Sequence, residues 1–198
     1  MINTTTQLLE QPSLTRHDSL LGHQQAWQLL ATLDKALDWQ QPRLRLFGRE
    51  HPIPRRQVWM GDAGYRYSGR DLIPVAWHPE IRRLGETVVA RLREEGLEFR
   101  YNSVLLNRYA DGEQRMGWHS DNESELGSAP VIAAVSLGDE RALRFRWKDR
   151  RSQAFNVILP HDSLLLMGPG TQRLLEHSLP SRRHAGLRIS LTFRWIHA

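Results

Sequence analysis

The 198 residues include no cysteine, which excludes disulfide bonds and thiolate metal ligands. Long apolar runs are also absent: no stretch of about 18 apolar residues exists, so no transmembrane helix is expected. Residues 1–10 lack the basic region and the apolar stretch of a signal peptide. Together these absences predict a cytoplasmic protein that does not enter a membrane.

Lysine is scarce as well, with 2 Lys against 25 Arg, and the formal net charge is +5. A basic surface favours polyanionic partners, and the planar guanidinium group suits phosphate and carboxylate. The alternative is that an arginine-heavy composition reflects a GC-rich genome. Charge therefore favours a nucleic-acid partner without deciding for it.

The chain length suits one domain with a sizeable core. We expect residues 1–17 to be a flexible tail, because they are polar and lack periodicity, and residues 18–198 to form a single domain. Helical spacing of apolar residues predicts helices at about 19–38, capped by Asp18 or Ser19, and at 79–95, between Pro79 and Gly96.

From Phe99 onward the chain alternates and turns repeatedly, which is typical of short strands. We expect strands at about 101–109, 131–137, 142–147, 154–159, 163–167, 173–178 and 187–196. Many short strands after two helices indicate an α+β protein, in which a β-sandwich or open barrel carries the helices against one sheet.

His119 and Asp121 stand two positions apart. On an extended segment such side chains point to the same side. A second histidine from a distant strand, as in Glu176-His177-Ser178, could complete the two-histidine, one-carboxylate set of non-haem Fe(II) oxygenases. The alternative is a solvated loop pair.

Residues 187–195 alternate between an apolar and a polar set, and the polar set contains Arg188, Ser190, Thr192 and Arg194. This period of two predicts a strand with one apolar and one polar face. An arginine on the inward face would suit a bidentate grip on a carboxylate. The alternative is that the arginine face looks at water.

Four segments in this order resemble the catalytic core of AlkB-type, 2-oxoglutarate- and Fe(II)-dependent dioxygenases: Asn107-Arg108-Tyr109, His119-Ser120-Asp121, His177-Ser178-Leu179-Pro180 and Arg188 through Arg194. The resemblance continues upstream through Tyr65–Gly69 and covers the chain from about Arg43. It implies a double-stranded β-helix, or jelly roll, with two helices of the N-terminal half against one sheet. It also implies a nucleotide-recognition lid at about 43–75 and a catalytic core at about 99–198.

The resemblance assigns Fe(II) to His119, Asp121 and His177. It assigns the cosubstrate 2-oxoglutarate to residues on two strands, with Arg188 at the distal carboxylate and Arg194 near the metal. The other three cosubstrate residues are Asn107, Tyr109 and Ser190, the last standing where many family members have Asn.

Phe47 stands at the tip of a predicted hairpin of residues 43–49, between arginines, and suits insertion beside a displaced base. The alternative is that it packs in the core. Tyr65 and Tyr67 share one side of an extended segment, and aromatic faces stack on bases; half-buried tyrosines over the core are the alternative. Arg55 and Trp59 lead into this lid and are expected to contact substrate.

Asn122 and Glu123 follow the expected metal ligand and could touch the exocyclic group of the base, or could brace the loop. Basic side chains on residues 141–151 could follow phosphate groups, although a solvated strand face is the alternative. Arg182, Arg183 and His184 form a second cationic loop; His161, His184 and His197 are expected at the surface.

The function implied is oxidative removal of N-alkyl lesions, such as 1-methyladenine and 3-methylcytosine, from DNA, with O₂ consumed and formaldehyde, succinate and CO₂ released. The alternatives are the same chemistry on RNA, a protein side chain or a small metabolite, and a nucleic-acid-binding module without catalysis. The expected partner is alkylated DNA, with RNA as the alternative, and the expected state is a monomer.

Overall fold

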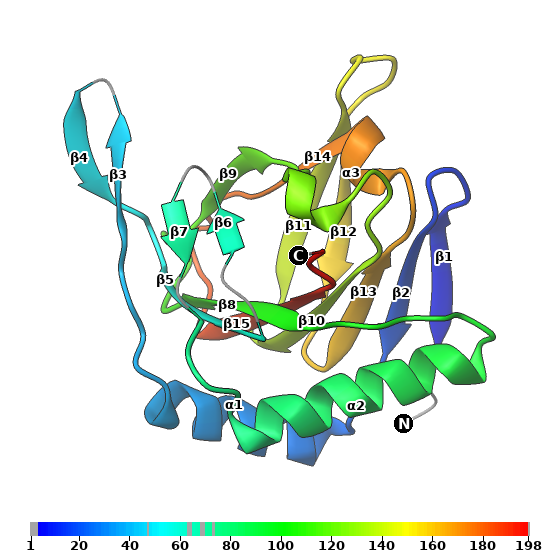
Figure 1. The fold of residues 1–198 in the computed structure, drawn as a ribbon, viewed down its shortest axis with the longest axis horizontal. Coiled ribbons are helices and arrows are strands. Elements are labelled where there is room, and N and C mark those ends of the chain that lie inside the picture. The colour runs from blue at the N-terminus through cyan, green and yellow to red at the C-terminus, as the bar shows by residue number, and fades with distance from the viewer. Residues whose placement is uncertain (1–3, 47, 63–64, 68–69, 73, 198) are drawn as a thin grey trace.

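The computed structural model describes residues 4–46, 48–62, 65–67, 70–72 and 74–197, without the side chains of residues 46, 65–67 and 70–72. Two antiparallel sheets form the body of the protein, and the two longer helices lie along one side of it (Figure 1). The helices are α1 (His23–Ala36), α2 (Pro79–Glu94) and the one-turn α3 (Thr171–Leu174), with a 3-10 turn η1 (Ser124–Leu126). No described helix is both long enough and apolar enough to cross a membrane.

The larger sheet has seven strands in the order β1-β2-β13-β10-β15-β8-β5. Their bounds are β1 (Thr5–Leu9), β2 (Leu14–Asp18), β5 (Arg56–Gly61), β8 (Ser103–Tyr109), β10 (Ile132–Gly138), β13 (Ser163–Met167) and β15 (Arg188–Arg194). The smaller sheet has the order β12-β11-β14-β9, with β9 (Met116–His119), β11 (Arg141–Trp147), β12 (Phe155–Leu159) and β14 (Leu175–Leu179). The predicted α+β jelly roll is confirmed by this arrangement.

The alternation of side chains along β10 shows how the core is divided. Ala133, Val135 and Leu137 point to the helices, where they join the apolar faces of α1 and α2. Ile132 and Ala134 point the other way, into an apolar layer between the two sheets. Since successive side chains of a strand alternate between its faces, one strand serves two cores. The prediction of helices against one sheet is confirmed.

Helix α2 matches its prediction closely. Pro79 occupies its first turn, His78 caps it through Nδ1, and Gly96 follows its end with φ +75°, a conformation that favours glycine. The apolar residues Ile81, Leu84, Val88 and Leu92 are buried against the sheet, as their spacing predicts.

Helix α1 is shorter than predicted, because it begins after Gly22 and has no side-chain cap. Trp27 lies on the outer side of this helix, with its side chain 43% exposed. The ring stacks on His161, with ring centroids 4.2 Å apart, so His161 is half-buried rather than fully at the surface. Leu30 and Leu33 fill the inward face of this helix.

The predicted flexible tail is wrong for most of its length, because β1 and β2 form a hairpin at the end of the larger sheet. β2 pairs with β13 over five residues, from Leu14↔Met167 to Asp18↔Ser163. Leu14 is fully buried between the sheets. Backbone pairing does not depend on side-chain type, which is why polar composition gave no signal for these strands.

The predicted hairpin of residues 43–49 is present as β3 (Arg43–Leu46) and β4 (Arg49–Pro52), and it projects away from the body (Figure 1). Phe47, which the sequence predicts at the tip, lies outside the described residues. A second small hairpin joins β6 (Tyr65–Tyr67) and β7 (Arg70–Leu72).

Candidate active site

The three expected metal ligands converge at one end of the smaller sheet. β9 and β14 are neighbours, and His119 and His177 are Cα partners across them. Asp121 follows two residues after the end of β9. One ligand atom from each of these residues lies within 4.8 Å of the others, although His177 stands far away in the sequence. The solvated loop pair, the alternative from the sequence, is wrong.

Asp121 presents one bonded and one unbonded carboxylate oxygen. Its Oδ2 accepts a hydrogen bond from Arg194 Nη2 at 2.8 Å, and the residue is 1% exposed. Its Oδ1 is buried without a hydrogen-bond partner among the described residues, 3.9 Å from His119 Nε2. Burial alone would raise the pKa of Asp121, but Arg194 and the two histidines lower it below its ordinary value. An unsatisfied anionic oxygen facing imidazole nitrogens suits a bound cation.

Both imidazoles can present a ring nitrogen to a metal. His119 Nδ1 lies 2.9 Å from the carbonyl oxygen of Gly117, so donation from Nδ1 leaves the Nε2 lone pair facing Asp121. Burial, with a smaller contribution from His119, lowers the pKa of His177 to about 3. The residues present therefore fit a divalent metal held by two histidines and one carboxylate.

The final strand turns its two arginines inward. Ile189, Leu191 and Phe193 of β15 join the helix-side core, so Arg188 and Arg194 point into the space between the sheets, where they are 3% and 2% exposed. The alternative that this face looks at water is wrong. Arg188 Nη2 donates to Ser136 Oγ at 2.9 Å, and burial lowers the pKa of Arg188 to about 10, so it stays cationic at neutral pH.

The expected cosubstrate residues share this inner face. β15 pairs with β8, which places Arg188 opposite Tyr109 and Ser190 opposite Asn107. The Arg188 guanidinium carbon lies 5.6 Å from the centroid of the Tyr109 ring. The larger sheet thus brings a buried cation, a phenol, an amide and a hydroxyl to one place beside the metal ligands. Such a set suits a small dicarboxylate.

Arg55 and Trp59 were expected to contact substrate, and the structure places both below the surface. Arg55 is 7% exposed, and its Nε donates to Asn107 Oδ1 at 2.7 Å. Trp59 is 4% exposed and packs with Leu105, Leu126 and Ile196. Both side chains face the inner side of the larger sheet, and their contact with substrate stays a prediction.

The remaining predicted substrate residues divide into two groups. Asn122 is exposed next to the metal ligand, and Glu123 is half-buried, with Oε2 unpaired among the described atoms. Phe47 and the side chains of Tyr65 and Tyr67 lie outside the described part of the chain. Their roles at the substrate stay predictions.

The basic segment of residues 141–151 is only partly a solvated face. Arg141 is 1% exposed and donates to the carbonyl oxygens of Asp111, Gln114 and Pro180, so its predicted contact with phosphate is wrong. Arg146 donates to Glu176 and lies over the Trp118 ring. In the second cationic loop, Arg182, Arg183 and His184 are all exposed, as predicted.

Two residues near the site were not foreseen. Ser136 holds Arg188, and its signal in the sequence was a lone hydroxyl within the apolar strand Ile132–Gly138. Gln172 is 1% exposed and accepts a hydrogen bond from the backbone N–H of Asp121 at 2.9 Å. Nothing in the spacing of residues could have placed Gln172 there, because the contact joins α3 to the segment after β9.

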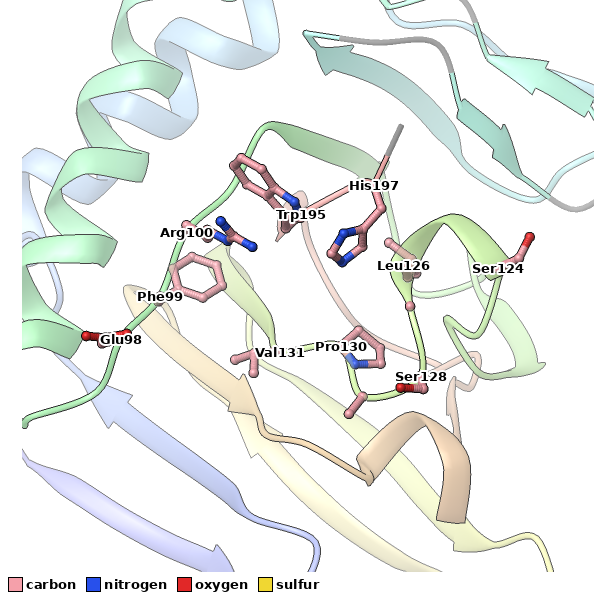
Figure 2. Close-up of a pocket in the computed structure, with 12 residues that line it drawn as sticks. Glu98, Phe99, Arg100, Ser124, Leu126, Ser128, Pro130, Val131, Trp195 and His197 are labelled. Atoms are coloured by element: carbon pink, nitrogen blue, oxygen red, sulfur yellow. The ribbon is translucent and has the colours of Figure 1, made fainter.

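A cavity of about 520 Å³ lies away from the metal ligands, between the segment after α2 and the loop after η1 (Figure 2). Arg100 stacks over the Trp195 ring at 4.2 Å, and His197 is exposed at the edge, as the sequence predicted. None of the three metal ligands is among its described lining residues, so this cavity is distinct from the metal centre.

A jelly roll with an inward His-Asp-His triad and a buried arginine beside it defines a non-haem Fe(II) oxygenase that uses a dicarboxylate cosubstrate. Residues 14–194 match the 2OG-Fe(II) oxygenase superfamily. The chain belongs to this superfamily and, within it, to the AlkB family.

The chain is similar to several curated proteins. It is 36% identical over 190 residues to DNA oxidative demethylase ALKBH2 of Bos taurus, covering 89% of this chain and 66% of that protein. The Homo sapiens ALKBH2 is also 36% identical, and the match covers 89% of this chain and 71% of that protein. Alpha-ketoglutarate-dependent dioxygenase alkB homolog 3 of Mus musculus is 33% identical over 182 residues, covering 85% and 61%. The chain thus spans about two thirds of the length of these relatives.

The fold also matches a solved structure described as "The structure of OsALKBH1", with a TM-score of 0.70 and 16% identity, covering 97% of this chain and 100% of that one. His119, Asp121 and His177 would hold Fe(II), Arg188 would hold 2-oxoglutarate, and the two groups together would supply oxidising chemistry. The chain's own residues hold, orient and shield these groups.

Proposed function

We propose that this protein is a DNA oxidative demethylase that removes N-alkyl groups from bases, with formaldehyde, succinate and CO₂ as products. The observation that carries the proposal is the convergence of His119, Asp121 and His177 beside the buried Arg188. The identity to proteins named DNA oxidative demethylase, over 89% of the chain, supports DNA as the substrate class.

Each set of residues has one task in this proposal. His119, Asp121 and His177 hold Fe(II), and Arg194 keeps the Asp121 carboxylate ionised through its ion pair. Arg188 binds one carboxylate of 2-oxoglutarate, while Asn107, Tyr109 and Ser190 offer hydrogen bonds along the same face. The location of the site between two sheets keeps bulk water from the reacting groups.

Substrate recognition is assigned to the surroundings of the metal. Asn122 and Glu123 follow Asp121 directly in the chain, and we assign to them the contact with an exocyclic group of the base. The lid of residues 43–75 supplies Phe47, Tyr65 and Tyr67, and the exposed Arg182 and Arg183 supply cations for phosphate. We include a monomeric state and a cytoplasmic location in the proposal.

The test is formaldehyde release from matched single- and double-stranded oligonucleotides that carry 1-methyladenine or 3-methylcytosine. We expect Asp121→Ala to abolish release on every substrate, because it removes a metal ligand, and Phe47→Ala to reduce repair mainly in duplexes. Arg144→Gln, at an exposed position on β11, is the control and should retain activity. Turnover of 2-oxoglutarate without any release from methylated oligonucleotides would reject DNA demethylation. If Phe47→Ala lowered formaldehyde release equally from single- and double-stranded oligonucleotides, insertion of Phe47 beside a displaced base would be rejected.

A further inference from the structure

The backbone of Asp121 pairs with none of the described strands. β9 ends at His119, and the pair His177↔His119 is the last described pair between β9 and β14 in the direction of Asp121. The next residues are irregular until η1. A ligand in such a segment needs other contacts to hold its main chain, since side-chain rotamers can only aim a carboxylate from a fixed backbone.

Gln172 provides that contact from the other side of the site. Its Oε1 accepts a hydrogen bond from Asp121 N at 2.9 Å, in a fully buried setting. A neighbouring contact reinforces it, as Ser120 Oγ donates to the carbonyl oxygen of Leu175 at 3.0 Å. The loop that carries the carboxylate ligand is thus attached to the α3–β14 segment, which carries the histidine ligand His177.

Gln172 is itself held in place by three elements. Its Nε2 donates to Met167 Sδ at 3.3 Å, and its carbonyl oxygen accepts from Lys148 Nζ at 2.8 Å. Its neighbour Thr171 donates from Oγ1 to the carbonyl oxygen of Ser13 in the N-terminal hairpin. The side chain is 1% exposed, so its amide orientation is fixed by buried partners.

We infer that Gln172 is a positioning residue for the metal centre: it fixes the main chain of Asp121 so that Oδ1 faces the two imidazoles. Arg194 orients the same carboxylate from its Oδ2 side. The two contacts therefore restrict Asp121 at its backbone nitrogen and at its carboxylate oxygen Oδ2. Partners that orient metal ligands in this way are typically worth about 10- to 100-fold in metal affinity.

This inference rests on the metal centre and not on the nucleic-acid substrate. It is tested by titrating the metal-free protein anaerobically with Co²⁺ and following the absorption of the bound ion, which needs no turnover. Gln172→Met keeps the side-chain volume but removes the acceptor, and Gln172→Glu keeps an acceptor oxygen. Met167→Leu is the matched control, because it removes the other partner of the Gln172 amide and leaves the bond to Asp121.

We expect Gln172→Met to weaken Co²⁺ binding by about 10-fold or more, and Gln172→Glu to restore most of that loss. Met167→Leu should bind Co²⁺ within about 2-fold of the native protein. The thermal midpoint of the metal-free Gln172→Met protein should match that of the metal-free Met167→Leu protein. Unchanged Co²⁺ affinity in Gln172→Met, or an equal loss in Met167→Leu, would overturn the inference. Failure to demethylate DNA would bear on the proposed function alone.

Discussion

At the scale of single residues, β15 contributes two buried arginines whose surroundings differ. Arg194 is paired with Asp121, so removing either partner leaves an uncompensated charge in the interior. Arg188 makes no ion pair among the described residues and donates only to the hydroxyl of Ser136. A buried cation with so little compensation is suited to an anionic ligand, which is the reason to place a cosubstrate carboxylate there.

Arg188→Met should therefore raise the KM for 2-oxoglutarate by about 100-fold, with a smaller change in kcat, because a charge-assisted bond to the cosubstrate is lost. Steady-state kinetics at saturating methylated oligonucleotide measure this. The metal-free variant should be no less stable than the native protein, since a partly compensated buried charge has been replaced by an apolar side chain. Ser136→Ala is the control, with less than about a 10-fold change in KM. An unaltered KM in Arg188→Met would contradict the assignment.

At the scale of elements, Arg141 joins two loops that adjoin the histidine-bearing strands. Its guanidinium donates to Asp111 and Gln114, before β9, and to Pro180, after β14. Arg182 N also donates to the carbonyl oxygen of Gly112 at 2.7 Å. A side chain on Gly112 would meet that same residue, as a Cβ would lie 2.2 Å from the Arg182 oxygen. The exposed cationic loop, which begins at Arg182, is thus held at its first residue by the Gly112 segment.

Arg141→Leu should lower the free energy of unfolding by about 3 kcal/mol, because three carbonyl groups lose a charged donor. Chemical denaturation monitored by circular dichroism measures the change. Arg144→Gln, on the same strand but exposed, should stay within about 0.5 kcal/mol of the native protein. Equal effects of the two substitutions would show that Arg141 does not join the loops.

The elements that sequence predicted well are those with a repeating contrast between apolar and polar residues. α2 shows a period of 3.6 and β15 a period of two, so the position and the inward face of each could be predicted directly. The strands β10 and β13 are apolar runs, and turn residues mark their ends. The hairpin of β1 and β2 lacks such contrast, and its position depends on backbone pairing with β13. The single turn of α3 is too short for any period, so residues 173–178 were predicted as strand throughout.

The site divides in the same way. His119, Asp121, Arg188 and Arg194 stood in local patterns that spacing can reveal, and His177 came through resemblance. Gln172 and Ser136 act across elements that meet only when the two sheets face each other. The prediction for Arg141 was wrong because alternation shows which face of a strand a side chain lies on, but not which backbone carbonyl groups of distant loops it will contact.

At the scale of the whole molecule, His17 connects three parts of the chain. It lies on β2, contacts Thr5 of β1, and approaches Glu95 at the end of α2, with Nδ1 3.1 Å from Glu95 Oε1. Arg91 and Asp18 also face it. Burial lowers the pKa of His17, an effect that Glu95 opposes without cancelling. The folded protein therefore favours the neutral imidazole.

Since its folded pKa is depressed, the stability that His17 contributes is present above about pH 6.5 and is lost as the pH falls below that value. The loss approaches about 1.4 kcal/mol per pH unit between the unfolded and folded pKa values. Denaturation at pH 7.5 and pH 5.5 should show a larger decline for the native protein than for His17→Gln. Parallel declines in the two proteins would rule out His17 as the source.

The two halves of the site belong to strands with unequal support. β15 is paired on both sides, by β10 and β8, whereas the four-residue β9 is the edge of the smaller sheet and pairs with β14 alone among the described strands. Amide protons of β9 should therefore exchange with deuterium far sooner than those of β15. Local opening of β9 would then let a metal held by His119 exchange, while the strand that carries Arg188 and Arg194 stays paired. Protein purified without iron should accordingly be reactivated by simple mixing, with no unfolding step.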